Sequence, residues 1–147
     1  MKDWFKRTEK QLYDYPVWQQ RLAHINDQLA RLEPRSTASY GAQGGGGGGN
    51  NSEPERLAAR RADLEQERRY LESKLRAIER VMKVWGDDEK NIFHYKYSQG
   101  WNDTQIYTLG VPMSKTKFYY TRSKMVQKAA RVWGYYKPVD KVELKMN

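Results

Sequence analysis

The sequence predicts an all-α protein in which a long N-terminal helical hairpin or coiled coil precedes a C-terminal helix-turn-helix domain. Apolar side chains recur at helical steps before residue 33, and they recur every seven residues from 57 to 85. Further along the chain, a turn leads into a strongly basic stretch with helical spacing. The apolar share of 38% and the charged share of 31% are typical of long, exposed helices.

Residues 1–33 are expected to hold the N-terminal helices. Their apolar side chains share one helical face, as in the seam of a coiled coil. These side chains are Trp18, Leu22, Ile25, Leu29 and Leu32. A shorter helix is expected ahead of them, from Asp3 to Tyr13. Pro16 marks a kink or break between the two helices, because proline lacks the backbone N–H that an inner helical turn requires.

Residues 34–53 form a low-complexity segment around six glycines, Gly44–Gly49. Ordering polyglycine loses much backbone entropy for little gain, so we expect a flexible linker. A phosphate-binding loop is the alternative. It is disfavoured because no strand precedes the glycines and no Lys-Ser or Lys-Thr pair follows them.

Residues 54–86 are expected to form one long coiled-coil-like helix that opens at Pro54, with Ser52 as its cap. Five apolar residues fall at seven-residue intervals: Leu57, Leu64, Leu71, Ile78 and Trp85. The companion seam is polar at first (Arg61) and apolar later (Leu75), which indicates pairing with one other helix. Three alternatives remain open: the N-terminal helix of the same chain folded back antiparallel, the same helix of a second subunit in a homodimer, and a solvated single helix.

Residues 87–137 are expected to form the helix-turn-helix domain, and residues 138–147 a C-terminal tail. The expected order is a helix Glu89–Tyr97, a turn Ser98–Trp101, a short helix Thr104–Leu109, a connection Gly110–Met113 and a recognition helix of about twenty residues from Lys115. Expected N-caps, in the same order, are an aspartate of the Asp87–Asp88 pair, Asn102 or Asp103, and Ser114.

Basic residues are concentrated in the last of these helices. Between positions 114 and 137 there is no acid, and the basic residues are Lys115, Lys117, Arg122, Lys124, Lys128, Arg131 and Lys137. They contribute +7 to a net charge of +9, whereas residues 1–113 hold 18 basic and 16 acidic residues. A basic helix behind a turn in a small domain is the electrostatic footprint of a DNA-binding module.

The first turns of this helix are expected to read DNA, because the N-terminal residues of a recognition helix reach base edges. The expected base contacts are Lys115, Thr116, Lys117 and Tyr120, with Thr121 on the same face. The expected phosphate contacts are Arg122, Lys124 and Lys128. The opposite face is expected to be core, with Phe118, Met125, Ala129 and Val132 flanked by Val126 and Trp133. The eleven tyrosines are compatible with stacking on unpaired bases, but no sheet platform accompanies them, so duplex DNA is favoured.

Other classes of function are disfavoured by composition. The chain has no cysteine, which excludes disulfides and thiolate zinc sites, and its two histidines, His24 and His94, are far apart. We therefore expect no metal, no cofactor and no enzyme, and Asp87–Asp88 is interpreted as a helix cap. No apolar run approaches the about 18 residues that span a bilayer, and residues 1–7 lack the apolar core of a signal peptide. A cytoplasmic location without a membrane partner is expected.

Several segments, in order, resemble phage transcriptional regulators of the ArpU and RinA type. The segments are Thr8–Pro16, the glycine-rich run with Ser52–Glu55, Ala77–Val81, Asp87–Lys90, Tyr95–Tyr97, Ser114–Tyr119 and Ala130–Gly134. The DNA-binding end of these regulators is similar to region 4 of sigma-70 factors. Two positions depart from the pattern: Tyr107 stands where alanine is usual, and the Gly110–Met113 connection is longer.

The resemblance implies a phage-encoded activator of late genes that binds promoter DNA in the host cytoplasm and contacts RNA polymerase. Its N-terminal helices would then mediate dimerisation or recruit a partner. A small terminase subunit, or another DNA-packaging or architectural protein, is the alternative within nucleic-acid binding. From another class, a coiled-coil adaptor would bind an acidic protein partner through the basic stretch.

Overall fold

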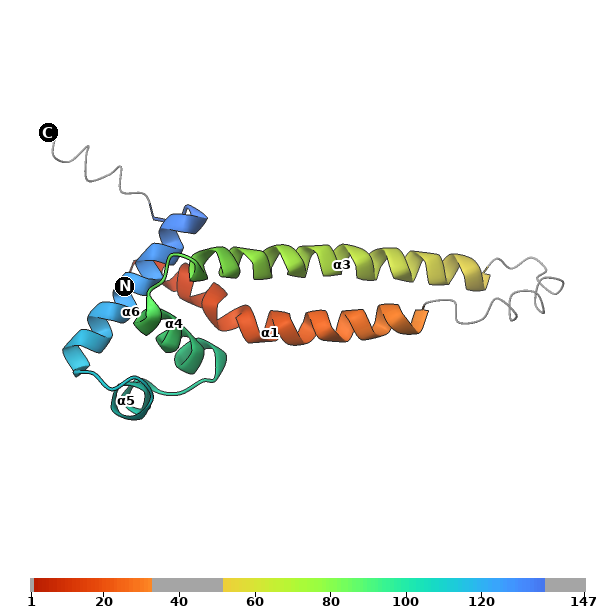
Figure 1. The fold of residues 1–147 in the computed structure, drawn as a ribbon. Helices are drawn as coiled ribbons and strands as arrows, with labels where there is room; N and C mark the ends of the chain where they lie inside the picture. The colour runs from red at the N-terminus through yellow and green to blue at the C-terminus, as the bar shows by residue number, and fades with distance from the viewer. Residues whose placement is uncertain (1, 33–51, 137–147) are drawn as a thin grey trace, which may run out of the picture. The chain divides into compact units, whose positions relative to one another are not determined.

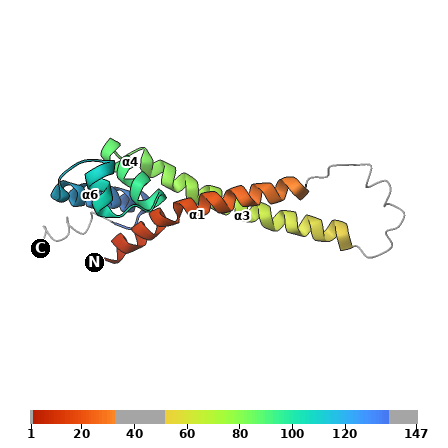
Figure 2. The ribbon, with the colours of Figure 1, turned by 90° about the horizontal axis from the view of Figure 1, so that it is seen from below.

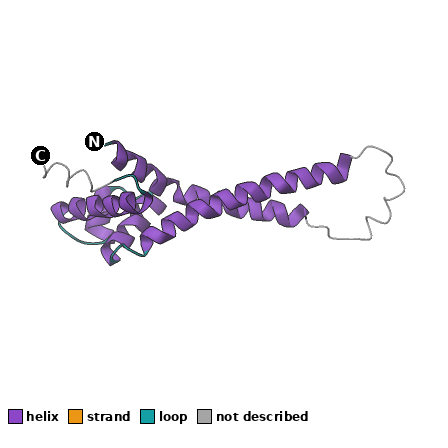
Figure 3. Cartoon of the chain, turned by 90° about the horizontal axis from the view of Figure 1, so that it is seen from above, coloured by secondary structure: helices purple, strands orange, loops and turns teal. Residues whose placement is uncertain are grey.

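The computed structural model describes residues 2–32 and 52–136. Within these residues every regular element is a helix, so the expected all-α class is confirmed (Figure 3). The chain divides into two compact units. Gln19–Ser73 is called the hairpin unit, and Met1–Trp18 with Lys74–Asn147 is called the aromatic unit. The expected linker and C-terminal tail lie outside the described residues, apart from two linker residues, Ser52 and Glu53, which are helical.

The segment before the linker is one helix, α1 (Asp3–Leu32), which continues through Pro16. The expectation of two helices with a break at Pro16 is therefore wrong. An inner proline costs a helix about 3 kcal/mol. Packing on both sides of the proline offsets this cost, because Leu12 is fully buried and Tyr15 and Trp18 pack against the core of the aromatic unit.

Within the hairpin unit, α1 runs antiparallel to α3 (Ser52–Met82), as Figures 1 and 2 show. Arg21 donates two hydrogen bonds to the Glu67 carboxylate, at 2.7 and 2.9 Å. Arg61, the polar seam residue, donates to the backbone carbonyl of Leu32 at 2.8 Å. The buried seam consists of Ile25, Leu29, Leu64 and Leu71. The long helices thus pair within one chain, in the first of the arrangements that the sequence leaves open.

The helical elements of the aromatic unit follow α3 in the expected order. They are α4 (Asp87–Ile92), η2 (Phe93–Ser98), α5 (Asp103–Gln105), η3 (Ile106–Gly110) and α6 (Lys115–Trp133). The elements η2 and η3 are π-helical continuations of α4 and α5. Each ends in a wide turn: the Gln99 N–H donates to the His94 carbonyl at 3.1 Å, and the Val111 N–H donates to the Ile106 carbonyl at 2.7 Å.

Helix caps fix where these elements begin. Ser114 Oγ accepts from the Lys117 N–H at 3.1 Å, so the expected cap of the basic helix is confirmed. Asn102 caps α5 by accepting from the Gln105 N–H at 2.8 Å. The expectation of an aspartate cap for α4 is wrong, because the N-cap is Gly86, whose N–H donates to Glu89 Oε1 at 2.8 Å. Both aspartates instead lie in the first turn of α4, where their charge favours the N-terminus of the helix.

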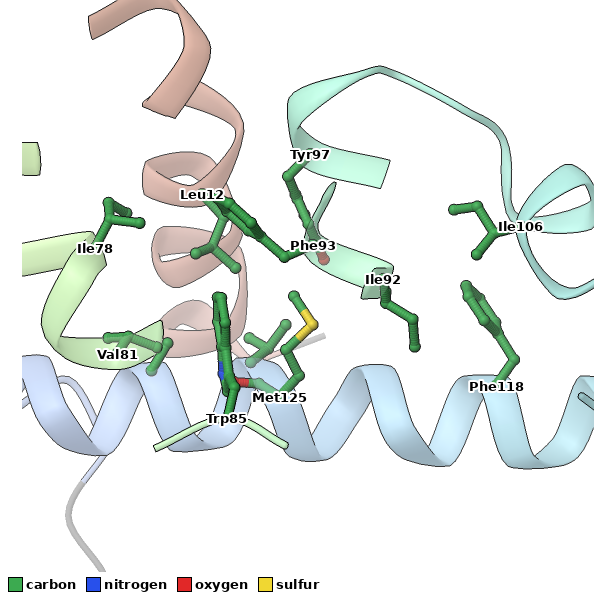
Figure 4. Packing of buried hydrophobic residues seen from close by; sticks show 12 residues of the cluster. Leu12, Ile78, Val81, Trp85, Ile92, Phe93, Tyr97, Ile106, Phe118 and Met125 are labelled. Carbon is green, nitrogen blue, oxygen red and sulfur yellow. The ribbon is translucent and has the colours of Figure 1, made fainter. Parts of the chain in front are cut away.

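The core of the aromatic unit joins side chains from α1, α3, α4, η2, η3 and α6 (Figure 4). Its central members are Leu12, Ile78, Trp85, Ile92, Phe93, Tyr97, Ile106, Phe118 and Met125. The Trp85 indole N–H donates to the Met125 carbonyl at 3.0 Å and so ties the turn after α3 to the middle of α6. The expected inward direction of Ile92, Phe93 and Tyr97 is confirmed.

The buried face of α6 differs from the expected core at Val132 and Ala130. Phe118, Met125, Val126 and Ala129 are fully buried, as expected. Val132 is 42% exposed, so its assignment to the core is wrong. Ala130 is buried in addition, and the Trp133 indole donates to the Ala77 carbonyl at 3.1 Å. The last turn of α6 therefore faces α3 through Trp133, which turns Val132 outward.

No helix among residues 2–32 and 52–136 has the length and apolar character needed to cross a bilayer.

Candidate nucleic-acid interface

The candidate interface is the outer face of the first four turns of α6. Phe118 and Met125 anchor the inner face of this helix in the core, and Ile106 packs opposite Phe118 (Figure 4). The connection from η3 to α6 passes Gly110, where a Cβ atom would lie 3.0 Å from the Tyr95 ring. Glycine at this position thus permits the close packing that places the start of α6.

Five of the expected DNA-binding residues lie exposed on this face. They are Lys115, Thr116, Lys117, Tyr120 and Lys124. Thr121, expected on the same face, is half-buried. In the described part of the chain, no acidic side chain forms an ion pair with Lys115 or Lys124. These two lysines therefore keep their charge available to a ligand.

Arg122 points into the unit instead of outward. It is only 16% exposed, and its guanidinium lies 4.0 Å from Glu9 Oε2 and 3.5 Å from Asp103 Oδ2. The Phe5 and Tyr119 rings flank it, with centroids 5.6 and 5.8 Å away. Its Nε is buried and lacks a hydrogen-bond partner among the described residues. A guanidinium held in this way connects α6 to α1 and α5, and it is poorly placed to meet a phosphate.

Lys128 and Lys117 also have acidic neighbours. The Lys128 ammonium donates to Glu89 Oε1 at 2.8 Å, and Glu89 is 6% exposed. The Lys117 ammonium lies 3.9 Å from Asp88 Oδ2, and both side chains are well exposed. The Lys128 contact joins α6 to α4, whereas solvent weakens the longer Lys117 contact. Folding thus brings acids from other segments to a helix that has none of its own.

A partly buried hydrogen bond supports the position of Arg122. The Tyr97 hydroxyl donates to Glu9 Oε2 at 2.6 Å. Burial raises the pKa of Tyr97 well above its ordinary value of 10.0, and the neighbouring Glu9 carboxylate raises it further. The phenol consequently stays protonated and keeps donating to the carboxylate that Arg122 faces.

Lys96 lies on the other side of this cluster. It donates to Asp103 Oδ1 at 2.7 Å, and Asp103 also faces Arg122. Burial alone would lower the pKa of Lys96, but the hydrogen bonds to Asp103 and Tyr13 outweigh burial and raise the pKa overall. The cluster therefore holds two cations between two carboxylates, with the Tyr97 hydroxyl as an additional donor.

The sequence did not indicate that α1 reaches this region. Trp4 and Phe5, in the first turn of α1, pack against the core that α6 completes. Together with α6 residues they line a shallow hollow of about 310 Å³. Its lining is Trp4, Phe5, Tyr120, Ser123, Lys124 and Gln127. The only signal in the sequence is the pair of adjacent aromatic residues near the N-terminus, and it does not identify the surface that they meet.

The described residues offer no site for a metal, since no three histidine or acidic side chains converge there. Comparison with protein-family models, with curated proteins and with solved structures finds no match for this chain. The geometry of α6 and its surroundings therefore carries the functional argument.

Proposed function

We propose that this chain is a transcription regulator that binds duplex DNA by placing the outer face of α6 in the major groove. The observation that supports this proposal best is the exposed, acid-free face that begins at the capped N-terminus of α6. The major groove is about 12 Å wide and accepts one helix with its side chains. The short α5–η3 element before α6 fits the supporting helix of a helix-turn-helix, which crosses the DNA backbone.

In this proposal the residues divide between bases and phosphates. Lys115, Thr116, Lys117 and Tyr120 contact base edges, because they lie on the exposed first turns. Lys124 contacts a phosphate. Thr121 is half-buried and serves at most the edge of the interface. Arg122 is left out because it pairs with Glu9 and Asp103, and Lys128 contributes through its bond to Glu89 in positioning α6.

The resemblance to the phage regulators supports a narrower form of the proposal, an activator of late genes that also contacts RNA polymerase. Nothing in the fold of the described residues distinguishes this form from a packaging or architectural protein. The difference lies in sequence specificity, since a regulator must discriminate its operator from competing DNA.

Selection of tight binders from a random duplex pool, at about physiological salt, tests the proposal. A single enriched motif is the expected result, and a repeated half-site would add dimerisation. Salt-sensitive binding without an enriched motif would favour the packaging or architectural alternative. Absence of DNA binding, together with binding to an acidic protein, would favour the adaptor.

Substitutions on α6 separate the two kinds of contact. Lys115→Ala should change the selected motif, because a base contact is lost. Lys124→Ala should lower the affinity for all DNA sequences by the same factor, and it should lower the slope of log affinity against log salt by about one unit. Each phosphate contact should account for a fall in affinity of about half a decade between about 50 and 200 mM salt. An unchanged motif in Lys115→Ala would remove the base-contact assignment.

A further inference from the structure

The hollow beside α6 combines an apolar wall with polar donors. Trp4 and Phe5 of α1 form the apolar wall (Figures 1 and 2 show the start of α1 beside α6). Ser123, Lys124 and Gln127 supply a hydroxyl, an ammonium and an amide from α6. No acidic residue lines the hollow. A sugar–phosphate backbone presents the complementary surfaces, because a deoxyribose ring is largely apolar and a phosphate accepts hydrogen bonds.

The first turns of α1 add positive charge to the same region. Lys2 and Lys6 are exposed, and within the described ranges neither forms an ion pair. Asp3 is the one acid among residues 2–7, against three basic residues. The third basic residue, Arg7, lies over the Tyr135 ring at 4.0 Å. Lys2 and Lys6 are thus exposed cations, close in sequence to Trp4 and Phe5, that no acid among the described residues neutralises.

We propose that this hollow holds the DNA backbone of the strand that borders the groove entered by α6. This inference rests on the proposed function, and it adds a contact with the DNA backbone to the contact of α6 with the major groove. A sugar packs against Trp4 and Phe5, and its phosphate accepts from Ser123, Lys124 and Gln127. Lys6 and Lys2 contact the next phosphates along the strand. The first turn of α1 thereby fixes the register of α6 along the duplex, as phosphate contacts generally do.

Charge reversal on α1 tests this contact. In the full chain, Lys6→Glu should lower the affinity for the selected duplex about tenfold, as expected for one lost charged hydrogen bond. The salt slope should fall by about one unit, and the selected motif should not change. Lys83→Glu is the matched control, because it makes the same charge change at an exposed lysine near the end of α3. Equal effects of the two variants would overturn the proposal.

The absence of cysteine permits a positional test. An iron chelate linked to the cysteine of an Asp3→Cys variant, at an exposed position next to Trp4, cleaves nearby DNA backbone by hydroxyl radicals. Cleavage at discrete positions beside the motif is expected, and none is expected from Lys83→Cys carrying the same chelate. Uniform cleavage from both positions would overturn the proposal.

Failure of this contact is distinguishable from failure of the proposed function. If Lys115→Ala alters duplex binding and Lys6→Glu leaves it intact, the backbone contact at the hollow is rejected and the DNA-binding role is retained. No duplex binding by the unaltered chain would reject both. The chain could instead bind single-stranded DNA more tightly than duplex DNA and lose this preference in Trp4→Ala. That result would indicate base stacking on Trp4 in place of backbone contact, and it would overturn the proposal.

Discussion

The hairpin unit and the aromatic unit bury their side chains in different ways. The hairpin unit has one aliphatic seam, and its cross-helix ion pair of Arg21 and Glu67 is exposed to solvent. The aromatic unit packs side chains from six helical elements, many of them aromatic, into one core that includes Phe118, and it encloses the Glu9–Arg122–Asp103 cluster. Periodicity along two helices is therefore enough to specify the first unit, whereas the second depends on contacts between segments far apart in the sequence.

The tryptophans make this difference measurable. All five, Trp4, Trp18, Trp85, Trp101 and Trp133, belong to the aromatic unit. Tryptophan emission therefore reports the aromatic unit, while far-ultraviolet circular dichroism reports helix in both units.

Phe118→Ala should have the largest effect. Phe118 is fully buried in the middle of the aromatic core, so its removal should cost about 3–5 kcal/mol of unfolding free energy. Denaturant unfolding followed by tryptophan emission measures this loss. Tyr120→Ala, two residues along the same helix and 63% exposed, is the control and should stay within about 0.5 kcal/mol. Equal losses would contradict the assignment of the buried and outer faces of α6.

Arg122→Ala should destabilise the aromatic unit by about 2–4 kcal/mol, because Glu9 and Asp103 lose their shared cation in a mostly buried site. Lys124→Ala, on the outer face, should change stability by no more than about 0.5 kcal/mol. For DNA affinity the two variants should show the opposite order: Lys124→Ala should lower the affinity more than Arg122→Ala, since only Lys124 is available to a phosphate. A stable Arg122→Ala variant with a reduced salt slope would show that Arg122 leaves the cluster to bind DNA.

Leu64→Ala should destabilise the hairpin unit by about 2–3 kcal/mol, because Leu64 is buried in its seam. The loss should be visible in far-ultraviolet circular dichroism at temperatures where tryptophan emission is still native. Leu57→Ala is the matched control, one heptad earlier and 45% exposed, and should have little effect. If circular dichroism and emission shift together, the two units unfold as one.

Arg21→Ala should have the smallest effect, and this effect should depend on pH. The hydrogen bond from Arg21 lowers the pKa of Glu67 below its ordinary 4.5. A lowered folded pKa contributes stability that is complete above the unfolded pKa and is lost as pH falls through the folded pKa. The difference in melting temperature between the unaltered chain and Arg21→Ala should be small at neutral pH and disappear in acid. A difference that grows in acid would contradict this pairing.

Local signals in the sequence were sufficient for the order of the helices after the linker and for two caps, Asn102 and Ser114. Ser114 caps α6 as expected, because capping involves residues only three positions apart. The seam residues Ile25 and Leu64 are buried as expected, because periodicity places them on one face. Pro16 misled the prediction, since its local cost is offset by packing that only the folded unit provides.

The surroundings of the basic helix could not be predicted in the same way. Arg122 looked like its basic neighbours in the sequence, but Glu9 and Asp103 reach it from α1 and α5. Glu89 reaches Lys128 from α4 in the same manner. Charge counted along one segment therefore overestimated the positive charge that α6 presents. Lys115 and Lys124 are exposed as expected, but only the fold shows that no acid among the described residues pairs with them.

A salt titration of the selected duplex would test whether the outer face of α6 binds DNA. The unaltered chain would be compared with a Lys115→Ala, Lys117→Ala and Lys124→Ala triple variant, with tryptophan emission confirming that the aromatic unit is folded. Loss of Lys124 in the triple variant should lower the salt slope by about one unit, and loss of Lys115 and Lys117 should remove the preference for the motif. A folded triple variant that binds the duplex with unchanged slope and preference would show that DNA lies on another surface.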